Sequence, residues 1–120
     1  MKAIVIVSHG SRWNDVSFEL KNIKEEIKRK FNSKCLIEYA FLEFCNPSIE
    51  EILEILVEKG CKKVILLPYF LSYGKHLKKD IPEIVKRFNS KMEITIADPI
   101  GTHPKIIEIL IDRINETEKL

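Results

Sequence analysis

The sequence predicts an α/β fold, an open sheet of four parallel strands in the order 2-1-3-4 with helices on both faces. Four short apolar runs, each typical of a buried strand, alternate with four stretches whose apolar residues recur at helical spacing. No linker or low-complexity segment interrupts this alternation, and right-handed crossovers between parallel strands then produce an open sheet. A chain of 120 residues is long enough for one core, so we predict a single domain over residues 1–120.

The N-terminal part of the chain contains two predicted strands and the helix between them. The first strand covers residues 3–7 (AIVIV), and the turn residues SHGS follow it at 8–11. The second strand is predicted at residues 35–41. Between the strands, apolar side chains separated by lysines and glutamates predict a helix; they are Val16, Leu20, Ile23, Ile27 and Phe31.

The second helix carries signals at both of its ends. Asn46 is predicted as its N-cap and Pro47 as part of its first turn, and Gly60 is well placed to end it. Glu50 and Glu51 lie on the side of the helix dipole that favours acidic residues. The side chains predicted to face the core are Ile49, Ile52, Leu53, Leu56 and Val57.

The C-terminal part repeats the pattern, with strands predicted at residues 63–68 and 92–97. Pro82 fits the first turn of the helix between them and argues against an earlier start. The inward side chains of that helix are predicted to be Leu77, Ile81, Ile84, Val85 and Phe88. The last helix begins near Pro104, and its predicted stripe is Ile106, Ile107, Leu110 and Ile114.

Composition indicates an ordinary globular protein of the cytoplasm. The net charge is only +2, and no basic stripe interleaved with aromatic residues indicates binding to nucleic acid. No apolar stretch approaches the length of a membrane span, and the N-terminus does not resemble a signal peptide. Cys35, Cys45 and Cys61 form no C-x-x-C pair, and an odd count without a secretion signal indicates reduced thiols.

Two of the three histidines follow strands that flank the switch point of the predicted sheet. With the order 2-1-3-4, a flavodoxin-like arrangement, ligands bind beyond the carboxyl ends of the first and third strands. His9 follows the first strand, and His76 closes the loop after the third, so we expect them to converge. His103 follows the fourth strand, one position further away, and Glu43 could add a carboxylate at the same edge.

Two convergent imidazoles favour a metal site with open positions. Imidazole binds divalent cobalt, nickel, zinc and copper, and near neutral pH it is also a natural proton acceptor. The chain has no G-x-G-x-x-G or Walker loop for phosphate and no G-x-S-x-G turn for a serine nucleophile. A phosphatase of the histidine type is also disfavoured, because Ser8 stands where an arginine would precede the histidine.

Four motifs together resemble the small archaeal CbiX-type sirohydrochlorin chelatases of the class II chelatase superfamily. They are SHGSR at 8–12, AFLEFCNPSIEE at 40–51, LLPYFLSYGKHLKKDIP at 66–82 and DPIGTHP at 98–104. The resemblance covers nearly the whole chain, and its most specific element is the string P-x-F-L-x-x-G-x-H-x-x-x-D-I-P.

The resemblance implies a single chelatase-like domain, a homodimer, and insertion of Co²⁺ or Ni²⁺ into sirohydrochlorin. No organic cofactor is implied; the metal is a substrate. Cobalt would serve cobalamin biosynthesis, and nickel would serve the coenzyme F430 pathway of methanogenesis. His9 and His76 would bind the metal, with His9 also accepting a proton. Glu43 and the segment before His76 would contact the tetrapyrrole; that segment comprises Pro68, Tyr69, Phe70, Leu71, Ser72, Tyr73 and Gly74.

Physical arguments from the residues themselves support a homodimer and leave the function and the metal open. A tetrapyrrole is wide compared with the sheet edge of so small a domain, so a cleft between two subunits is expected. Arg12 and the lysines at 75, 78 and 79 could meet the substrate's carboxylates as point charges, although exposed lysines more often only face solvent. A non-catalytic carrier of metal or tetrapyrrole would need the same two histidines, and the sequence does not choose among cobalt, nickel and iron.

Overall fold

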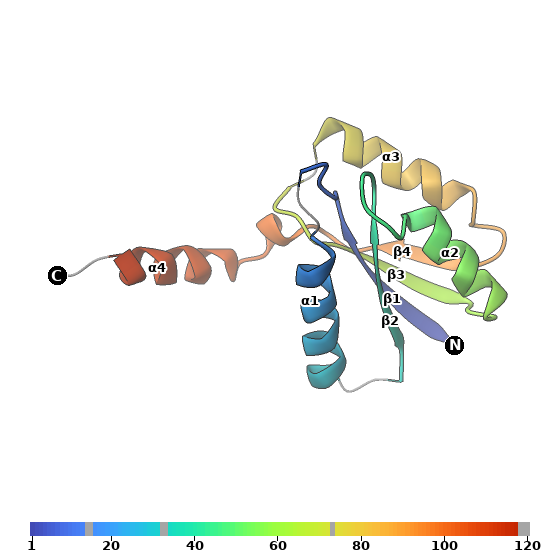
Figure 1. Ribbon diagram of the computed structural model, residues 1–120, viewed down its shortest axis with the longest axis horizontal. Coiled ribbons are helices and arrows are strands. Elements are labelled where there is room, and N and C mark those ends of the chain that lie inside the picture. Colours follow the sequence, from blue (N-terminus) through green and yellow to red (C-terminus); the bar gives the residue numbers. More distant parts are fainter. Residues whose placement is uncertain (14–15, 32–33, 73, 118–120) are drawn as a thin grey trace.

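A parallel sheet forms the centre of the molecule. The computed structural model describes residues 1–13, 16–31, 34–72 and 74–117, with the backbone alone described at 75 and 76. The strands of the sheet are β1 (Lys2–Ser8), β2 (Leu36–Phe41), β3 (Lys63–Pro68) and β4 (Glu93–Ile96). They are all parallel and lie in the order β2-β1-β3-β4 (Figure 1), so the predicted strand order is confirmed.

The carboxyl ends of the three strands around the switch point lie level. Ser8 of β1 is opposite Phe41 of β2, and Val7 of β1 is opposite Pro68 of β3. The loops that follow these strands therefore emerge side by side at one edge of the sheet. In an open sheet of this kind, that edge is where ligands bind.

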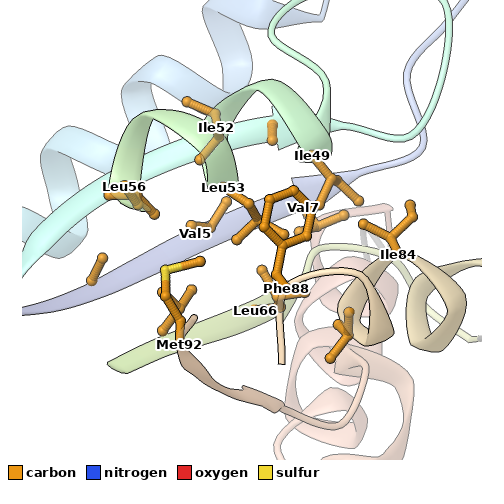
Figure 2. Packing of buried hydrophobic residues seen from close by; sticks show 14 of the residues in the cluster. Val5, Val7, Ile49, Ile52, Leu53, Leu56, Leu66, Ile84, Phe88 and Met92 are labelled. Atoms are coloured by element: carbon orange, nitrogen blue, oxygen red, sulfur yellow. The ribbon is translucent and has the colours of Figure 1, made fainter. Parts of the chain in front are cut away.

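Alternation along the strands divides the core between the two faces of the sheet. Ala3, Val5 and Val7 face α2 (Ile49–Glu58) and α3 (Lys75–Lys86), while Ile4 and Ile6 face α1 (Ser17–Lys30). Figure 2 shows the larger core, in which side chains from α2, from α3 and from the segment after α3 pack over strand residues Val5, Val7 and Leu66. Helices thus cover both faces, as predicted.

The start of α2 differs from the prediction, and its end agrees. The N-cap is Ser48, whose Oγ accepts the Glu51 N–H at 3.1 Å while the Glu51 carboxylate accepts the Ser48 N–H at 3.3 Å. Asn46 and Pro47 precede the helix and are joined by a cis peptide bond, so their predicted places as cap and first turn are wrong. The reciprocal capping box satisfies two backbone donors, which no side chain further upstream can do. Gly60 ends the helix with φ of +79°, as predicted.

The start of α3 was also mispredicted. The helix begins at Lys75, which leaves Pro82 in its interior instead of its first turn. Proline there removes one intrahelical hydrogen bond. The buried side chains of this segment offset that loss by packing against the sheet; they are Ile81, Ile84, Val85 and Phe88.

The last helix departs most from the predicted core. After the short 3-10 turn η1 (Ile100–Thr102), α4 (Ile106–Thr117) extends away from the sheet (Figure 1), and the molecule measures 57 × 33 × 26 Å. Ile107, Leu110 and Ile114 were predicted to face the core, yet they are 56%, 53% and 54% exposed. The helix forms where its periodicity predicts, but its main contacts are with η1, so its apolar stripe is not buried within this chain.

The cysteines and the helix lengths agree with the composition. Cys61 is buried, Cys35 and Cys45 are half-buried, and none of the three forms a disulfide within the described residues. Within the described ranges, no helix is both long enough and apolar enough to span a bilayer.

Candidate functional site

The SHG turn after β1 is built to approach the loop after β2. Gly10 has a φ of +94°, and a Cβ atom at this position would lie 1.9 Å from the carbonyl oxygen of Glu43. Only glycine permits both that conformation and that approach. Two backbone hydrogen bonds join the loops, from Leu42 N–H to Ser8 O at 3.0 Å and from Glu43 N–H to His9 O at 3.1 Å. The two loops therefore form one unit that presents His9 and Glu43.

The side chains of His9 and Glu43 face each other across this unit. The distance from His9 Nε2 to Glu43 Oε1 is 4.0 Å, and each side chain is 50% exposed. At this distance the carboxylate places negative charge beside the ring, where it attracts a cation, while solvent and a ligand can still reach the ring. The structure thus brings Glu43 to the sheet edge of His9, and the role of each residue stays a prediction.

An open cavity of about 620 Å³ lies beside His9, between the two loops and α3. It is lined by His9, Leu42, Glu43, Glu50, Leu77, Asp80, Glu83, Ile84 and Arg87. Four of these residues are acidic, and Arg87 Nη2 lies 3.5 Å from the carboxylate of Glu50 at the α2–α3 side. A divalent cation entering this cavity meets a negative field on its way to the imidazole.

The backbone of His76 is placed beside the same cavity. His76 lies in the first turn of α3, directly before Leu77, which lines the cavity with His9. The His76 side chain lies outside the described residues, so its convergence on His9 stays a prediction. Among the residues that the structure describes, no three His, Cys, Asp or Glu side chains are grouped closely enough to hold a metal ion.

The segment after β3 does not present all of its predicted substrate residues to one surface. The side chain of Pro68 is fully buried, and Phe70 is partly buried and packs against the larger core. Leu71 is 65% exposed, and Ser72 and Gly74 are also exposed. Tyr73 lies outside the described residues. Substrate contact by Leu71, Ser72 and Gly74 is sterically open, whereas Pro68 could offer only its backbone.

Tyr69 faces the opposite side of the sheet from His9, toward α1. Its phenol O–H donates to Glu19 Oε1 at 3.0 Å. Burial raises the pKa of Tyr69 above its ordinary value of 10.0, and the hydrogen bond and negative charge of Glu19 raise it further. Tyr69 also lines a mostly apolar hollow of about 300 Å³ on that side.

His103 lies in the same hollow as Tyr69 and away from the cavity beside His9. Its Nδ1 accepts a hydrogen bond from the backbone N–H of Lys105 at 3.1 Å, which supports the chain where α4 begins. This contact is that of a residue capping the turn before the helix.

Sequence reasoning missed a glycine and two aromatic residues at this edge. Gly101 allows the loop after β4 to approach the loop after β3, since a Cβ atom there would lie 2.0 Å from Leu71 O. Trp13 is 86% exposed and Phe44 is 50% exposed, and the Arg12 guanidinium carbon lies 4.7 Å from the centre of the Phe44 ring. Arg12, Trp13 and Phe44 line a further open cavity of about 430 Å³. The sequence signal that could have identified Trp13 and Phe44 is the presence of aromatic residues in the loops that follow predicted strands.

Comparison with known proteins identifies the family. The family model described as CbiX matches residues 3–117 of this chain. A protein of Saccharolobus islandicus named sirohydrochlorin cobaltochelatase is 36% identical over an alignment that covers 98% of this chain and 96% of the relative. A protein of the same name from Sulfolobus acidocaldarius is also 36% identical, covering 94% of this chain and 89% of the relative.

Solved structures agree with that result. The sirohydrochlorin chelatase SirB from Bacillus subtilis subspecies spizizenii, solved in complex with cobalt, superposes with a TM-score of 0.83 and 30% identity. The alignment covers 97% of this chain but only 50% of SirB, so this chain spans about half the length of that relative. From the family match, the near full-length relatives and the shared fold, we conclude that the chain belongs to the CbiX family.

Proposed function

We propose that this chain is a sirohydrochlorin chelatase that inserts Co²⁺, or Ni²⁺, into sirohydrochlorin with release of two protons. Family membership and relatives named sirohydrochlorin cobaltochelatase support this function. The observation that carries it is the position of His9, half-exposed at the switch-point edge, 4.0 Å from Glu43 and beside an open acidic cavity. Cobalt is the first choice because the relatives are named for it, and nickel remains open because imidazole binds both.

His9 has the exposure and surroundings that metal transfer requires. Chelation exchanges two pyrrole N–H protons for one M²⁺, so the site must hold a metal loosely and accept protons. A neutral imidazole from His9 and one from His76 would leave most metal positions open for pyrrole nitrogens. The acids lining the cavity attract the cation without closing its coordination shell.

Glu43 is suited to assist the proton step. Its carboxylate lies 4.0 Å from His9 Nε2 and is half-exposed. When His9 takes a pyrrole proton, this carboxylate stabilises the imidazolium and offers a path for the proton to solvent. In this proposal His9 is both metal ligand and base, His76 is the second ligand, and Glu43 stabilises the charge that develops.

The loops at the carboxyl edge of the sheet offer contacts for a large anionic macrocycle. Leu71 of the 68–74 segment and Phe44 are exposed apolar side chains in strand-end loops. Arg12 lies over the Phe44 ring and can meet a carboxylate of the substrate. Since a tetrapyrrole exceeds one such edge, we include in the proposal a homodimer whose cleft receives the substrate between subunits.

A turnover assay distinguishes this function from a carrier. Protein is mixed anaerobically with excess sirohydrochlorin and Co²⁺, and the absorbance change is followed against a protein-free blank. An enzyme forms many product molecules per chain, and His9→Ala removes that turnover while His103→Ala keeps most of it. Product equal to the amount of protein, and no more, would show a carrier instead. Repeating the assay with Ni²⁺ and Fe²⁺ in competition identifies the preferred metal.

A further inference from the structure

The open cavity of about 430 Å³ between the loops after β1 and β2 differs in charge from the cavity beside His9. It is lined by Ser11, Arg12, Trp13, Ser17, Phe44, Cys45 and Asn46. Among the residues that the structure describes there, Arg12 alone is charged, whereas four acidic residues line the cavity beside His9. An anionic ligand is therefore attracted to the first cavity and repelled from the second.

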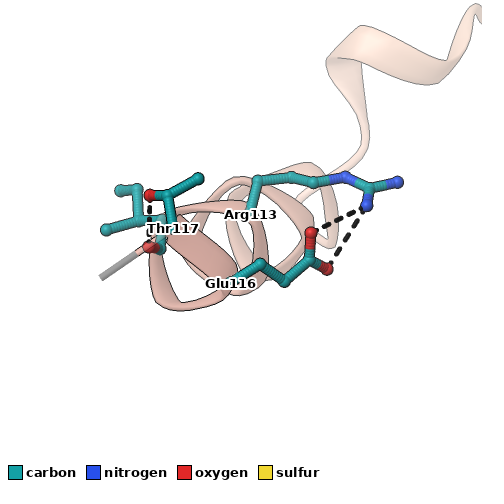
Figure 3. Close-up of polar contacts among 4 residues, drawn as sticks. Arg113, Glu116 and Thr117 are labelled. Carbon is teal, nitrogen blue, oxygen red and sulfur yellow. Dashed lines mark hydrogen bonds and ion pairs between the residues drawn. The ribbon is translucent and has the colours of Figure 1, made fainter. Parts of the chain in front are cut away.

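Arg12 differs from the other arginines of the chain in its partner. The other three each pair with a carboxylate; the pairs are Arg29 with Glu26, Arg87 with Glu50, and Arg113 with Glu116 (Figure 3). Arg12 forms no ion pair with any residue that the structure describes, and its guanidinium carbon lies 4.7 Å from the centre of the Phe44 ring. Stacking on a ring orients the planar guanidinium, and its N–H groups can then bind a carboxylate at the edge.

Phe44 has an unfavourable backbone conformation. Its φ is +66°, and among the described residues other than glycine it alone has a positive φ. A bulky residue rarely occupies this region, because its side chain is strained there. The conformation places the Phe44 ring beneath Arg12, while the preceding Glu43 faces His9. Strain next to a candidate site indicates a functional reason for this arrangement.

Trp13 adds a second aromatic side chain to the same cavity, and it is 86% exposed. Its backbone N–H donates to Ser11 Oγ at 3.2 Å, and Cys45 Sγ donates to Ser11 O at 3.6 Å. Ser11 therefore connects Trp13 to the loop after β2. Trp13 and Phe44 together present two aromatic side chains that a flat ring can cover.

These side chains correspond in chemistry to the edge of a tetrapyrrole that carries carboxylates. Aromatic side chains stack on a flat conjugated ring, and a guanidinium binds a carboxylate at the edge of that ring. Arg12 follows His9 closely in the sequence, so their Cα atoms are at most about 11 Å apart. A macrocycle can therefore direct its nitrogens to His9 and an edge carboxylate to Arg12 at the same time.

We propose that Arg12, Trp13 and Phe44 bind one edge of the tetrapyrrole and select for rings that carry many carboxylates. The acidic cavity on the α3 side then stays open to the metal ion. This inference rests on the proposed function and adds to it a substrate-recognition site, whose test needs neither metal nor turnover.

Binding of metal-free porphyrins tests the selection by charge. Uroporphyrin and coproporphyrin share one ring, and coproporphyrin has methyl groups where uroporphyrin has acetates. Titration of the full-length protein into each porphyrin, followed by Soret absorbance, gives two dissociation constants. The wild type should bind uroporphyrin about five-fold more tightly or better, the effect of one charge contact in water. Equal affinities would overturn the selection for carboxylates.

Alanine substitutions test the aromatic contact. Trp13→Ala should weaken uroporphyrin binding about 10-fold, and Trp13→Phe should recover most of the affinity. Phe18→Ala is the matched control, because Phe18 is also an exposed aromatic residue, at 73%, but does not line the cavity. Its affinity should equal that of the wild type. Equal losses in the two alanine variants would overturn a specific role of Trp13.

Glutamine substitutions separate a binding contact from net charge. Arg12→Gln should weaken uroporphyrin binding about five-fold and coproporphyrin binding less, and this effect should shrink in 1 M salt, where the Debye length is about 3 Å. Arg29→Gln removes the same charge from a residue already paired with Glu26, so both dissociation constants should stay unchanged. An equal effect of the two glutamines would show a net-charge effect and overturn the role of Arg12.

Phe44→Asn separates recognition from folding. Asparagine tolerates a positive φ, so this variant should unfold at no lower denaturant concentration than the wild type and still bind uroporphyrin more weakly. Wild-type affinity in Phe44→Asn would overturn the role of the ring. A protein that shows all these differences but inserts no cobalt would contradict the chelatase proposal alone. A protein that inserts cobalt and shows none of them would contradict the recognition site alone.

Discussion

Replacing Gly10 with alanine should separate the two loops that carry His9 and Glu43. The added Cβ atom would lie 1.9 Å from Glu43 O, so the backbones must move apart by about 1.5 Å to reach the ordinary contact distance of 3.4 Å. The φ of +94° adds strain of about 1–2 kcal/mol for a residue with a Cβ atom. Straining two interloop hydrogen bonds adds about 1 kcal/mol each. The expected loss of unfolding free energy is about 3–4 kcal/mol.

Gly10→Ala should also slow turnover in the fraction of the protein that stays folded. A displacement of about 1 Å in a positioned catalytic group costs roughly 100-fold in rate, so we expect cobalt insertion to fall by about that factor in the protein that remains folded. Chemical denaturation gives the stability change, and initial rates corrected for the folded fraction give the activity change.

Gly60→Ala is the matched control for Gly10→Ala. Gly60 also has positive φ, +79°, but a Cβ atom there meets nothing within 4 Å. This variant should lose only the conformational term, about 1–2 kcal/mol, and keep the wild-type rate. Wild-type stability and rate in Gly10→Ala, or an equal loss of rate in Gly60→Ala, would refute the reasoning that the close loop approach positions His9.

Three further predictions follow from named contacts. His103→Ala should reduce insertion less than His76→Ala, because His103 lies in the hollow on the α1 side; the reverse order of rates would place the metal site wrongly. Ser48→Ala should lower the unfolding free energy by about 1 kcal/mol in denaturant titrations through loss of the capping box, and an unchanged midpoint would contradict that role. The pKa of Tyr69 is raised above 10.0, so its stabilising contribution is complete below pH 10 and is lost as pH rises through the folded-state value. In an ultraviolet titration, the wild type should show one tyrosine that ionises at a pH above its ordinary pKa of 10.0, and Tyr69→Phe should lack that step. If Tyr69→Phe instead lost a step at the ordinary tyrosine pKa, the contact with Glu19 would be contradicted.

The strand order and the edge of the site could be predicted from sequence because both depend on simple patterns. Apolar runs such as AIVIV identify buried parallel strands, and the turns after them identify the loops at the carboxyl edge. That reasoning placed His9 and Glu43 on neighbouring loops, which the structure confirms at 4.0 Å.

The predicted starts of α2 and α3 are wrong because competing local interactions set where each helix begins. Asn46 is a good cap in isolation, but Ser48 and Glu51 cap reciprocally and set the start of α2 at Ile49. Pro82 signals a first turn, yet the buried side chains around it hold α3 continuous from Lys75. Neither outcome can be read from one residue's preference, because each depends on the balance of two contacts.

The surroundings of α4 lay beyond what periodicity can predict. A stripe at i, i+3, i+4 and i+7 indicates that a helix packs against something, but not whether that surface belongs to the same chain. The prediction of a helix with an apolar stripe is confirmed, but the prediction that the stripe packs in this chain's core is wrong, since Leu110 is 53% exposed. The burial of the Pro68 side chain could not be predicted either, because a motif identifies a segment of the chain and not which of its side chains are exposed.

The most direct test of the central claim is the rate of cobalt insertion by His9→Ala at saturating sirohydrochlorin, corrected for the uncatalysed rate. Circular dichroism and thermal unfolding of the same sample establish that it is folded, which the 50% exposure of His9 favours. A base that also binds the metal contributes at least about 100-fold, so we predict a loss of that size or greater while the fold is retained. A folded His9→Ala protein that inserts cobalt at the wild-type rate would contradict the assignment of His9 as metal ligand and proton acceptor.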